Sequence, residues 1–170
     1  MPVLRLVLAL SLLLSAPAAT AAPELGATLP TRGVLAPGKS LGGIELGATR
    51  AQVRSRWGSR YTLCTVCTRT TWLYTYRGRS TAGAAVSFRD GRVAAVFTLG
   101  VPSGWHTSRG ISLGDPADKV HTVYGVLPWS RCIGYGAVSI RRGGSVASIY
   151  TYGDSVYGFA LTLPSEPVCQ

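Results

Sequence analysis

Two stretches of the chain repeat one pattern of apolar and polar positions. Residues 44–58 align without a gap on residues 111–125, and both read Ile-x-Leu-Gly, then a polar segment with a valine, then an aromatic residue and a glycine. In each copy the valine and the aromatic residue are four positions apart, which places them on one face of an α-helix. Such short helices are not stable alone in water, so each has to pack on another element. The pattern predicts two helices with the buried pairs Val53–Trp57 and Val120–Tyr124.

The predicted helices begin with different capping residues. In the first copy Thr49 and Gln52 have the spacing of a capping box. In the second copy we expect Asp115 to be the N-cap and Pro116 to take the first helical position. A glycine in each copy, Gly58 and Gly125, is expected to end the helix.

Segments rich in strand-forming residues follow each helix. In the first copy they are 72–76, 84–88 and 93–99, and in the second copy 137–141, 146–152 and 155–163. The dipeptides Asp90-Gly91 and Gly153-Asp154 are typical of tight hairpin turns. The sequence therefore predicts an α+β fold of two tandem repeats, each a short helix followed by about three antiparallel strands, with the helices packed on one face of the sheet.

The turn residues also predict which side chains share a face. A two-residue turn at Asp90-Gly91 places one apolar set on the face beneath the helix: Val86, Phe88, Val93, Ala95, Phe97 and Leu99. The second hairpin leaves two alternatives open. A two-residue turn places Tyr150, Tyr152, Tyr157 and Phe159 on one face, whereas analogy with the first hairpin splits them.

The chain divides into five segments. Residues 1–22 have the features of a signal peptide, with Arg5, an apolar run at 6–14 and small residues before the cleavage point. That run is shorter than the roughly 20 residues that a membrane-spanning helix needs. Residues 23–40 are interpreted as a flexible leader, 41–101 as the first repeat, 102–109 as a linker and 110–170 as the second repeat. We expect a secreted protein with no membrane span.

Four cysteines in an exported chain predict two disulfide bonds, for which three pairings exist. Cys64 and Cys67 are close enough in sequence to close a tight loop, and a bond between Cys132 and Cys169 would hold the C-terminus. We expect these two pairs. A bond from Cys64 to Cys132 would instead join the two repeats.

The chain carries a net charge of +10, and the first repeat has nine arginines against Glu45 and Asp90. Such a balance is typical either of ordinary solubility or of attraction to a polyanion. His106 and His121 have no spacing to cysteine or acidic residues that suggests zinc, and the Cys64-x-x-Cys67 motif follows a helix instead of opening one. We expect no catalytic set, no metal and no cofactor.

The order of these motifs resembles two bacterial families. Residues 47–58, 71–77 and 86–93 look like the small outer-membrane-assembly lipoprotein domain, and the tandem layout is similar to the secreted β-lactamase-inhibitory proteins. The likeness covers 41–99 well and 110–163 loosely, and the anchoring cysteine of the lipoproteins is missing. It implies a non-enzymatic scaffold that binds proteins through a sheet face.

Tyrosine, tryptophan and arginine dominate the energetics of protein interfaces. We therefore predict a binding surface on the exposed sheet face, made by Trp72, Tyr74, Arg89, Tyr150 and Tyr152. The function hypothesis is a secreted protein-interaction module, in one form an inhibitor, which is a monomer and binds another extracytoplasmic protein. The alternative is a basic protein that binds an anionic cell-wall polymer, and nucleic acid is not expected as a partner.

Overall fold

The computed structural model describes residues 28–76 and 82–169, and the predicted signal peptide lies outside them. Within these ranges the chain forms twelve strands and two helices of eight residues each, α1 (Arg50–Trp57) and α2 (Ala117–Tyr124). Strand makes up 47% of the structure and helix 12%, so the fold is mostly β and the predicted balanced α+β layout is wrong. The sequence pattern missed the shortest strands, which are two to four residues long and too short to show alternation.

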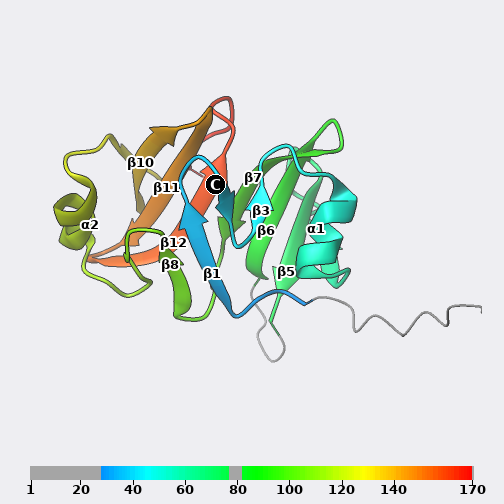
Figure 1. Cartoon of the computed structure of the whole chain (residues 1–170), viewed down its shortest axis with the longest axis horizontal. Helices are drawn as coiled ribbons and strands as arrows, with labels where there is room; N and C mark the ends of the chain where they lie inside the picture. The colour runs from blue at the N-terminus through cyan, green and yellow to red at the C-terminus, as the bar shows by residue number, and fades with distance from the viewer. Residues whose placement is uncertain (1–27, 77–81, 170) are drawn as a thin grey trace, which may run out of the picture.

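Eight strands form one antiparallel sheet, whose order is β4-β5-β6-β7-β12-β11-β10-β9. The strands from the first half of the chain lie on one side of the sheet and those from the second half on the other (Figure 1). Their bounds are β4 (Tyr61–Leu63), β5 (Thr71–Thr75), β6 (Ala82–Arg89), β7 (Arg92–Thr98), β9 (Trp129–Arg131), β10 (Gly136–Arg142), β11 (Ser145–Tyr152) and β12 (Ser155–Thr162).

A second sheet has the order β3-β2-β1-β8, with the bounds β1 (Arg32–Ala36), β2 (Ser40–Leu41), β3 (Ile44–Glu45) and β8 (Gly104–Thr107). Strands β1 and β8 pair in parallel. They lie in the segments that the sequence analysis interpreted as a flexible leader and a linker, and the sequence analysis predicted no strand in either. Neither segment shows strand alternation, and each is ordered by its pairing with the other, 72 positions away (104 − 32 = 72).

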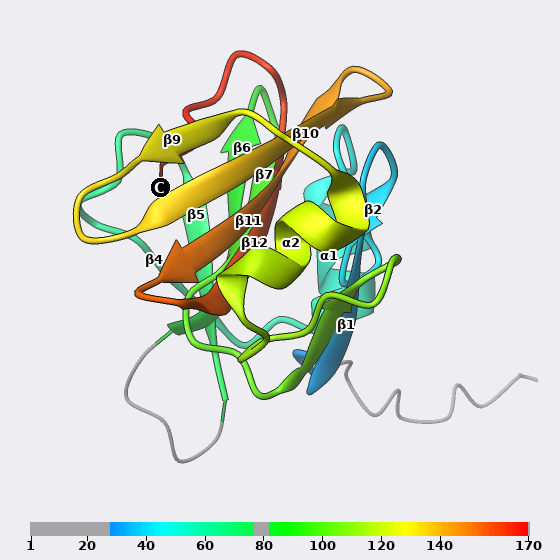
Figure 2. The ribbon, with the colours of Figure 1, turned by 90° about the vertical axis from the view of Figure 1, so that its left-hand side faces the viewer.

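The larger core lies between the eight-stranded sheet and a layer made by the helices and the small sheet. Figure 1 shows α1 and α2 at opposite ends of the molecule with β1 between them, and in Figure 2 α2 lies in front of β10, β11 and β12. Trp57 and Trp105 are both buried, with ring centroids 6.1 Å apart and edge to face. Trp105, which the sequence placed in a linker, is therefore a central core residue.

Gly58 and Gly125 end the two helices as expected, but the starts of the helices agree with the sequence in one half only. Thr49 and Gln52 form the predicted capping box at the start of α1. At α2, however, Pro116 is the N-cap and makes no side-chain capping bond. Asp115 instead accepts hydrogen bonds from the Ser112 N–H at 2.7 Å and from Lys119 Nζ at 2.8 Å, so its carboxylate closes the turn before the helix.

A β-bulge changes the predicted face assignment in the first hairpin. Phe88 pairs with Val93, but Ser87 pairs with Ala95, so Ala94 is an extra residue on β7. An extra residue inverts the alternation beyond it. Ala95 and Phe97, predicted beneath the helix, therefore lie on the opposite face.

The second hairpin has a bulge at the corresponding place. Thr151 pairs with Val156 and Tyr150 with Gly158, which leaves Tyr157 as the extra residue. Phe159 then packs in the larger core, whereas the rings of Tyr150 and Tyr157 lie together on the other face. The structure therefore follows the second alternative, in which the set is split between the two faces, and the bulge decides that Phe159 is the residue separated from the tyrosines.

The disulfide bonds join Cys64 to Cys67 and Cys132 to Cys169, the two pairs expected from the sequence. Disulfides form and persist outside the reducing cytoplasm, so the two bonds indicate an extracytoplasmic protein. No helix within 28–76 or 82–169 is long and apolar enough to cross a membrane.

Candidate binding surface

The eight-stranded sheet has one face that the helices do not cover, here called the rear face. The C-terminal tail, residues 163–169, packs across the centre of this face. The tail ends at the disulfide between Cys169 and Cys132, and the Tyr150 hydroxyl donates a hydrogen bond to the Val168 carbonyl at 3.0 Å. Beneath the tail is a small second core of buried residues: Ala85, Ala95, Phe97, Ala137, Tyr150 and Ala160. The predicted open sheet face is therefore largely closed by the chain itself.

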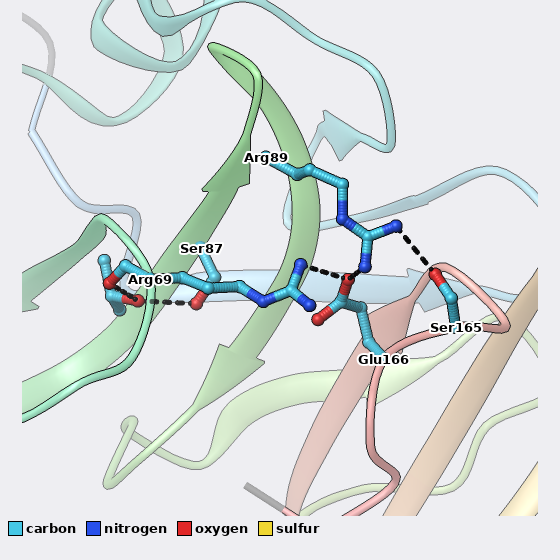
Figure 3. Close-up of polar contacts among 6 residues, drawn as sticks. Arg69, Ser87, Arg89, Ser165 and Glu166 are labelled. Carbon is cyan, nitrogen blue, oxygen red and sulfur yellow. Dashed lines mark hydrogen bonds and ion pairs between the residues drawn. The ribbon is translucent and has the colours of Figure 1, made fainter.

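Two arginines hold the tail at the edge of the rear face. Arg69 Nη1 lies 2.7 Å and Arg89 Nη2 lies 2.5 Å from the same carboxylate oxygen of Glu166, and Arg89 also donates to the Ser165 hydroxyl at 2.9 Å (Figure 3). The Glu166 side chain is only 4% exposed, while both arginine side chains are more than one third exposed. We call Arg69 and Arg89 the arginine fork. Its contacts show that Arg89, predicted to bind a partner, is engaged within the chain.

The other end of the rear face carries four tyrosines, here called the tyrosine cluster: Tyr135, Tyr150, Tyr152 and Tyr157. The Tyr157 ring centroid lies 5.8 Å from that of Tyr135, 6.0 Å from that of Tyr150 and 6.4 Å from that of Tyr152. Tyr152 is 69% exposed and Tyr157 is 37% exposed, whereas Tyr150 is buried beneath them. The cluster therefore has a buried base and an exposed aromatic rim.

The phenols of Tyr150 and Tyr157 keep their protons at neutral pH. Burial, reinforced by the neighbouring Tyr135 hydroxyl, raises the pKa of Tyr157 to about 12. Burial also raises the pKa of Tyr150 well above its ordinary value. These groups are consequently neutral hydrogen-bond donors and acceptors under physiological conditions, and they suit recognition better than proton transfer.

The structure separates the predicted binding residues. Trp72 and Tyr74 are buried on the helix side of the sheet. Trp72 stacks on Tyr61 with 3.9 Å between ring centroids, and the Arg54 guanidinium lies over the Trp72 ring, 5.7 Å from its centroid. The Tyr74 hydroxyl donates to the Gly58 carbonyl at 3.3 Å. Both residues are core residues and lie on no exposed sheet face, because Tyr61 stacks on Trp72 and the Trp57 ring of α1 lies 5.4 Å from the Tyr74 ring, centroid to centroid.

Only Tyr150 and Tyr152 of the predicted set lie together. The sequence analysis missed their neighbours Tyr135 and Tyr157, and also the exposed Trp129 on the helix side of the sheet. Tyr157 reaches the cluster because it is the extra residue of a bulge, and Tyr135 precedes β10 in a loop held by the disulfide. The short strand around Trp129 shows no alternation, so its exposed indole carried no readable signal beyond residue type.

A hollow of about 500 Å³ lies beside the tyrosine cluster and shares Tyr135 with it. The Trp129 side chain at its wall is 56% exposed, and Ile133, between two lining residues in sequence, is fully exposed. The lining residues are Ala117, Trp129, Arg131, Cys132, Gly134, Tyr135, Gly136, Thr151 and Gly153. The hollow and the tyrosine cluster adjoin at Tyr135, and we call the two together the aromatic surface of the second half. Trp129 lies on the helix side of the sheet, where it pairs with Val138, and the tyrosine cluster lies on the rear face.

Another groove, of about 480 Å³, lies where the turn after β1 meets the turn between β10 and β11. Four of its lining residues are glycines, and its charged side chains are Lys39 and Glu45, which have opposite signs. The groove thus presents mainly backbone atoms and one side-chain charge of each sign. It has no aromatic lining residue, so it has fewer groups that could recognise a partner than the aromatic surface has. No group of three or more potential metal ligands occurs within the described ranges.

No family model matches the chain, and no curated protein matches its sequence. Two solved structures are similar to it. One is an extracellular protein containing an SCP domain from Bacillus anthracis str. Ames, with a TM-score of 0.47 and 9% identity, covering 70% of this chain and 44% of that one. The other is the DUF4309 family protein YjgB from Bacillus subtilis subsp. subtilis str. 168, with a TM-score of 0.44 and 9% identity, covering 68% and 78%.

This chain spans less than half of the first of these proteins. With TM-scores below 0.5, neither likeness carries an argument about function. The resemblance to the outer-membrane-assembly lipoproteins and β-lactamase-inhibitory proteins remains a prediction from sequence.

Proposed function

We propose that the protein is a secreted, non-catalytic binding module that holds another extracytoplasmic protein through the aromatic surface of its second half. The observation that carries this proposal is the exposed aromatic rim of Tyr152 and Tyr157, whose ring centroids lie 6.4 Å apart over the buried Tyr150, beside a hollow that exposes Trp129 on the helix side of the sheet. Tyrosine and tryptophan give large contact areas with few rotatable bonds, so they lose little entropy on binding. Inhibition of an enzyme is the form that such binding takes in the β-lactamase-inhibitory proteins.

The proposal is tested by capture from the secreted proteins of the native organism, followed by affinity measurement with the captured protein. The Tyr152→Ala/Tyr157→Ala double variant removes the exposed rim and leaves the buried Tyr150 in place. Since a hot-spot residue contributes about 2 kcal/mol or more, we expect affinity to fall at least about thirtyfold. A Leu63→Ala/Val66→Ala variant, which removes two exposed apolar side chains from the first half, is the matched control and should bind normally.

Retention of the same proteins by the wild type and by the tyrosine double variant would refute this function. Equal loss in the control variant would also count against it, because the binding would then not depend on the second half.

We also infer a second candidate function, binding of an anionic cell-wall polymer by α1. Arg50 lies over the Phe88 ring at 5.4 Å and Arg54 over the Trp72 ring at 5.7 Å, so both guanidinium groups are supported at the surface. Arg56 adds a further exposed cation on the same helix, and none of the three forms an ion pair within the described residues. Three exposed cations on one helix without acidic partners favour a polyanion.

Retention on anionic cell-wall material should then fall steeply with salt and fall further in an Arg50→Gln/Arg54→Gln/Arg56→Gln variant. The Tyr152→Ala/Tyr157→Ala variant should be retained like the wild type. Salt-insensitive retention would exclude the polymer as the ligand.

A further inference from the structure

The strand registers of the two hairpins match residue by residue around their bulges, which shows what differs between the halves of the chain. Phe88 and Thr151 hold the same place, since each lies on the turn side of the bulge and pairs with the valine, Val93 or Val156, that directly precedes the extra residue. Arg50 and Ala117 are likewise the first residues of α1 and α2. The corresponding surfaces of the two halves can therefore be compared.

In the first half, large side chains occupy the space between the first residue of the helix and the turn side of the bulge. The Arg50 guanidinium lies 5.4 Å from the centroid of the Phe88 ring and covers it. In the second half the two residues are the short side chains of Ala117 and Thr151, and both line the hollow of about 500 Å³. The hollow is thus the volume that an arginine and a phenylalanine occupy in the other half of the same chain.

The walls of the hollow are aromatic and positively charged. Trp129 presents an exposed indole, and Arg131, two residues along the same strand, has an exposed side chain that forms no ion pair within 28–76 or 82–169. No acidic residue lines the hollow; Asp154 follows the lining residue Gly153 in sequence and is bonded to α2 through its backbone carbonyl. The charge of the hollow is therefore available to a ligand of opposite sign.

The first half shows how such a charge is satisfied in this chain. Counting back from the bulge along the paired strands, Arg69 holds the place that Tyr135 holds in the second half. Arg69, with Arg89, binds the buried carboxylate of Glu166. In the first half, the carboxylate of Glu166 in the chain's own tail is thus the partner of the arginines. In the second half, no carboxylate of the described residues pairs with Arg131 or lines the hollow.

We propose that the hollow takes an acidic side chain of a bound polypeptide, whose carboxylate pairs with Arg131 while its methylene groups lie against the Trp129 indole. A guanidinium binds a carboxylate with two parallel hydrogen bonds, and an indole face accepts aliphatic carbon. The inference rests on the proposed protein-binding function, and it identifies an acidic anchor residue as the partner chemistry.

The probe is a blocked tetrapeptide, acetyl-Ser-Glu-Ala-Ser-amide, with the Gln peptide as its neutral isostere. Binding is followed by NMR through the indole N–H signal of Trp129, the one exposed tryptophan beside the buried Trp57, Trp72 and Trp105. We expect a saturable shift of that signal with the Glu peptide. Affinity should be about tenfold weaker for the Gln peptide and for the Arg131→Gln variant, since a charge-assisted hydrogen bond is lost in each.

Arg60→Gln is the matched control, because it removes the same charge from an exposed position in the first half. The inference is overturned if the Trp129 signal does not move, if the Glu and Gln peptides bind equally, or if Arg60→Gln weakens binding as much as Arg131→Gln. A response to polygalacturonate and none to the Glu peptide would overturn it in favour of an acidic polysaccharide.

Capture experiments separate this inference from the proposed function. If Tyr152→Ala/Tyr157→Ala abolishes capture and Arg131→Gln does not alter it, the protein-binding function stands and the acidic anchor is wrong. If neither variant alters capture, both are wrong.

Discussion

Removing the two disulfides separately should destabilise the chain by different amounts. The Cys132–Cys169 bond closes a loop with a sequence separation of 37, whereas the Cys64–Cys67 bond has a separation of 3. In the chain-entropy model, a loop of the first length constrains the unfolded chain by about 4 kcal/mol and one of the second length by about 2 kcal/mol. The variant Cys132→Ala/Cys169→Ala should therefore lose about 2 kcal/mol more than Cys64→Ala/Cys67→Ala.

Equilibrium urea unfolding, followed by circular dichroism, measures this difference directly. With a slope of about 2 kcal/mol per molar urea, the two variants should have midpoints about 1 M apart. The Cys64→Ala/Cys67→Ala variant is the matched control, since it removes the same two sulfur atoms from a more exposed loop. Equal midpoints, or a lower midpoint for the control, would refute the reasoning that the C-terminal tail is constrained mainly by its long loop.

Three other perturbations follow from single contacts. Glu166→Gln should lower the free energy of unfolding by about 2 kcal/mol in urea titration, less than the 3–5 kcal/mol for breaking a fully buried ion pair, because both arginines are partly exposed. Gly33→Ala should cost about 3 kcal/mol or prevent folding, since its Cβ would lie 2.3 Å from the Trp105 ring, whereas Val34→Ala next to it should cost under about 0.5 kcal/mol. The folded chain holds the Tyr157 proton more tightly than the unfolded chain, so this phenol stabilises the fold below pH 10 and its contribution disappears as the pH rises towards about 12. Tyr157→Phe should flatten the fall in thermal stability over that interval, and an unchanged profile would contradict the raised pKa.

Several local features of the fold could be predicted from the sequence. The capping box at Thr49, the turn at Asp90-Gly91 and the two disulfide pairs occur as expected. Each depends on residues close together in the chain or, for the cysteines, on a small number of pairings. Such interactions are visible in sequence because the physical requirement and the residues that meet it lie within a few positions of one another.

The binding surface could be predicted only in part. Tyr152 is exposed as expected, but Trp72 and Tyr74 have the same residue types and the same strand alternation and are buried. Sequence alternation says which residues share a face, and it does not say which face another layer of the protein will cover. Here α1 covers one face and the C-terminal tail covers the centre of the other, so among the described residues the exposed aromatics Trp129, Tyr152 and Tyr157 all lie in the second half.

The repeated stretch of the sequence determined that the chain would use one helix and one hairpin twice, because the periodicities of helix and strand are written in consecutive residues. The tertiary structure alone decided the balance of helix and strand, the parallel pairing of β1 with β8, and the two bulges. Strand pairing joins residues far apart in sequence, and a bulge inverts every side chain beyond it, so its effect is not readable from the local pattern. The bulge at Tyr157 brings this tyrosine beside Tyr150 and Tyr152, and the aromatic surface of the second half is therefore a product of the fold.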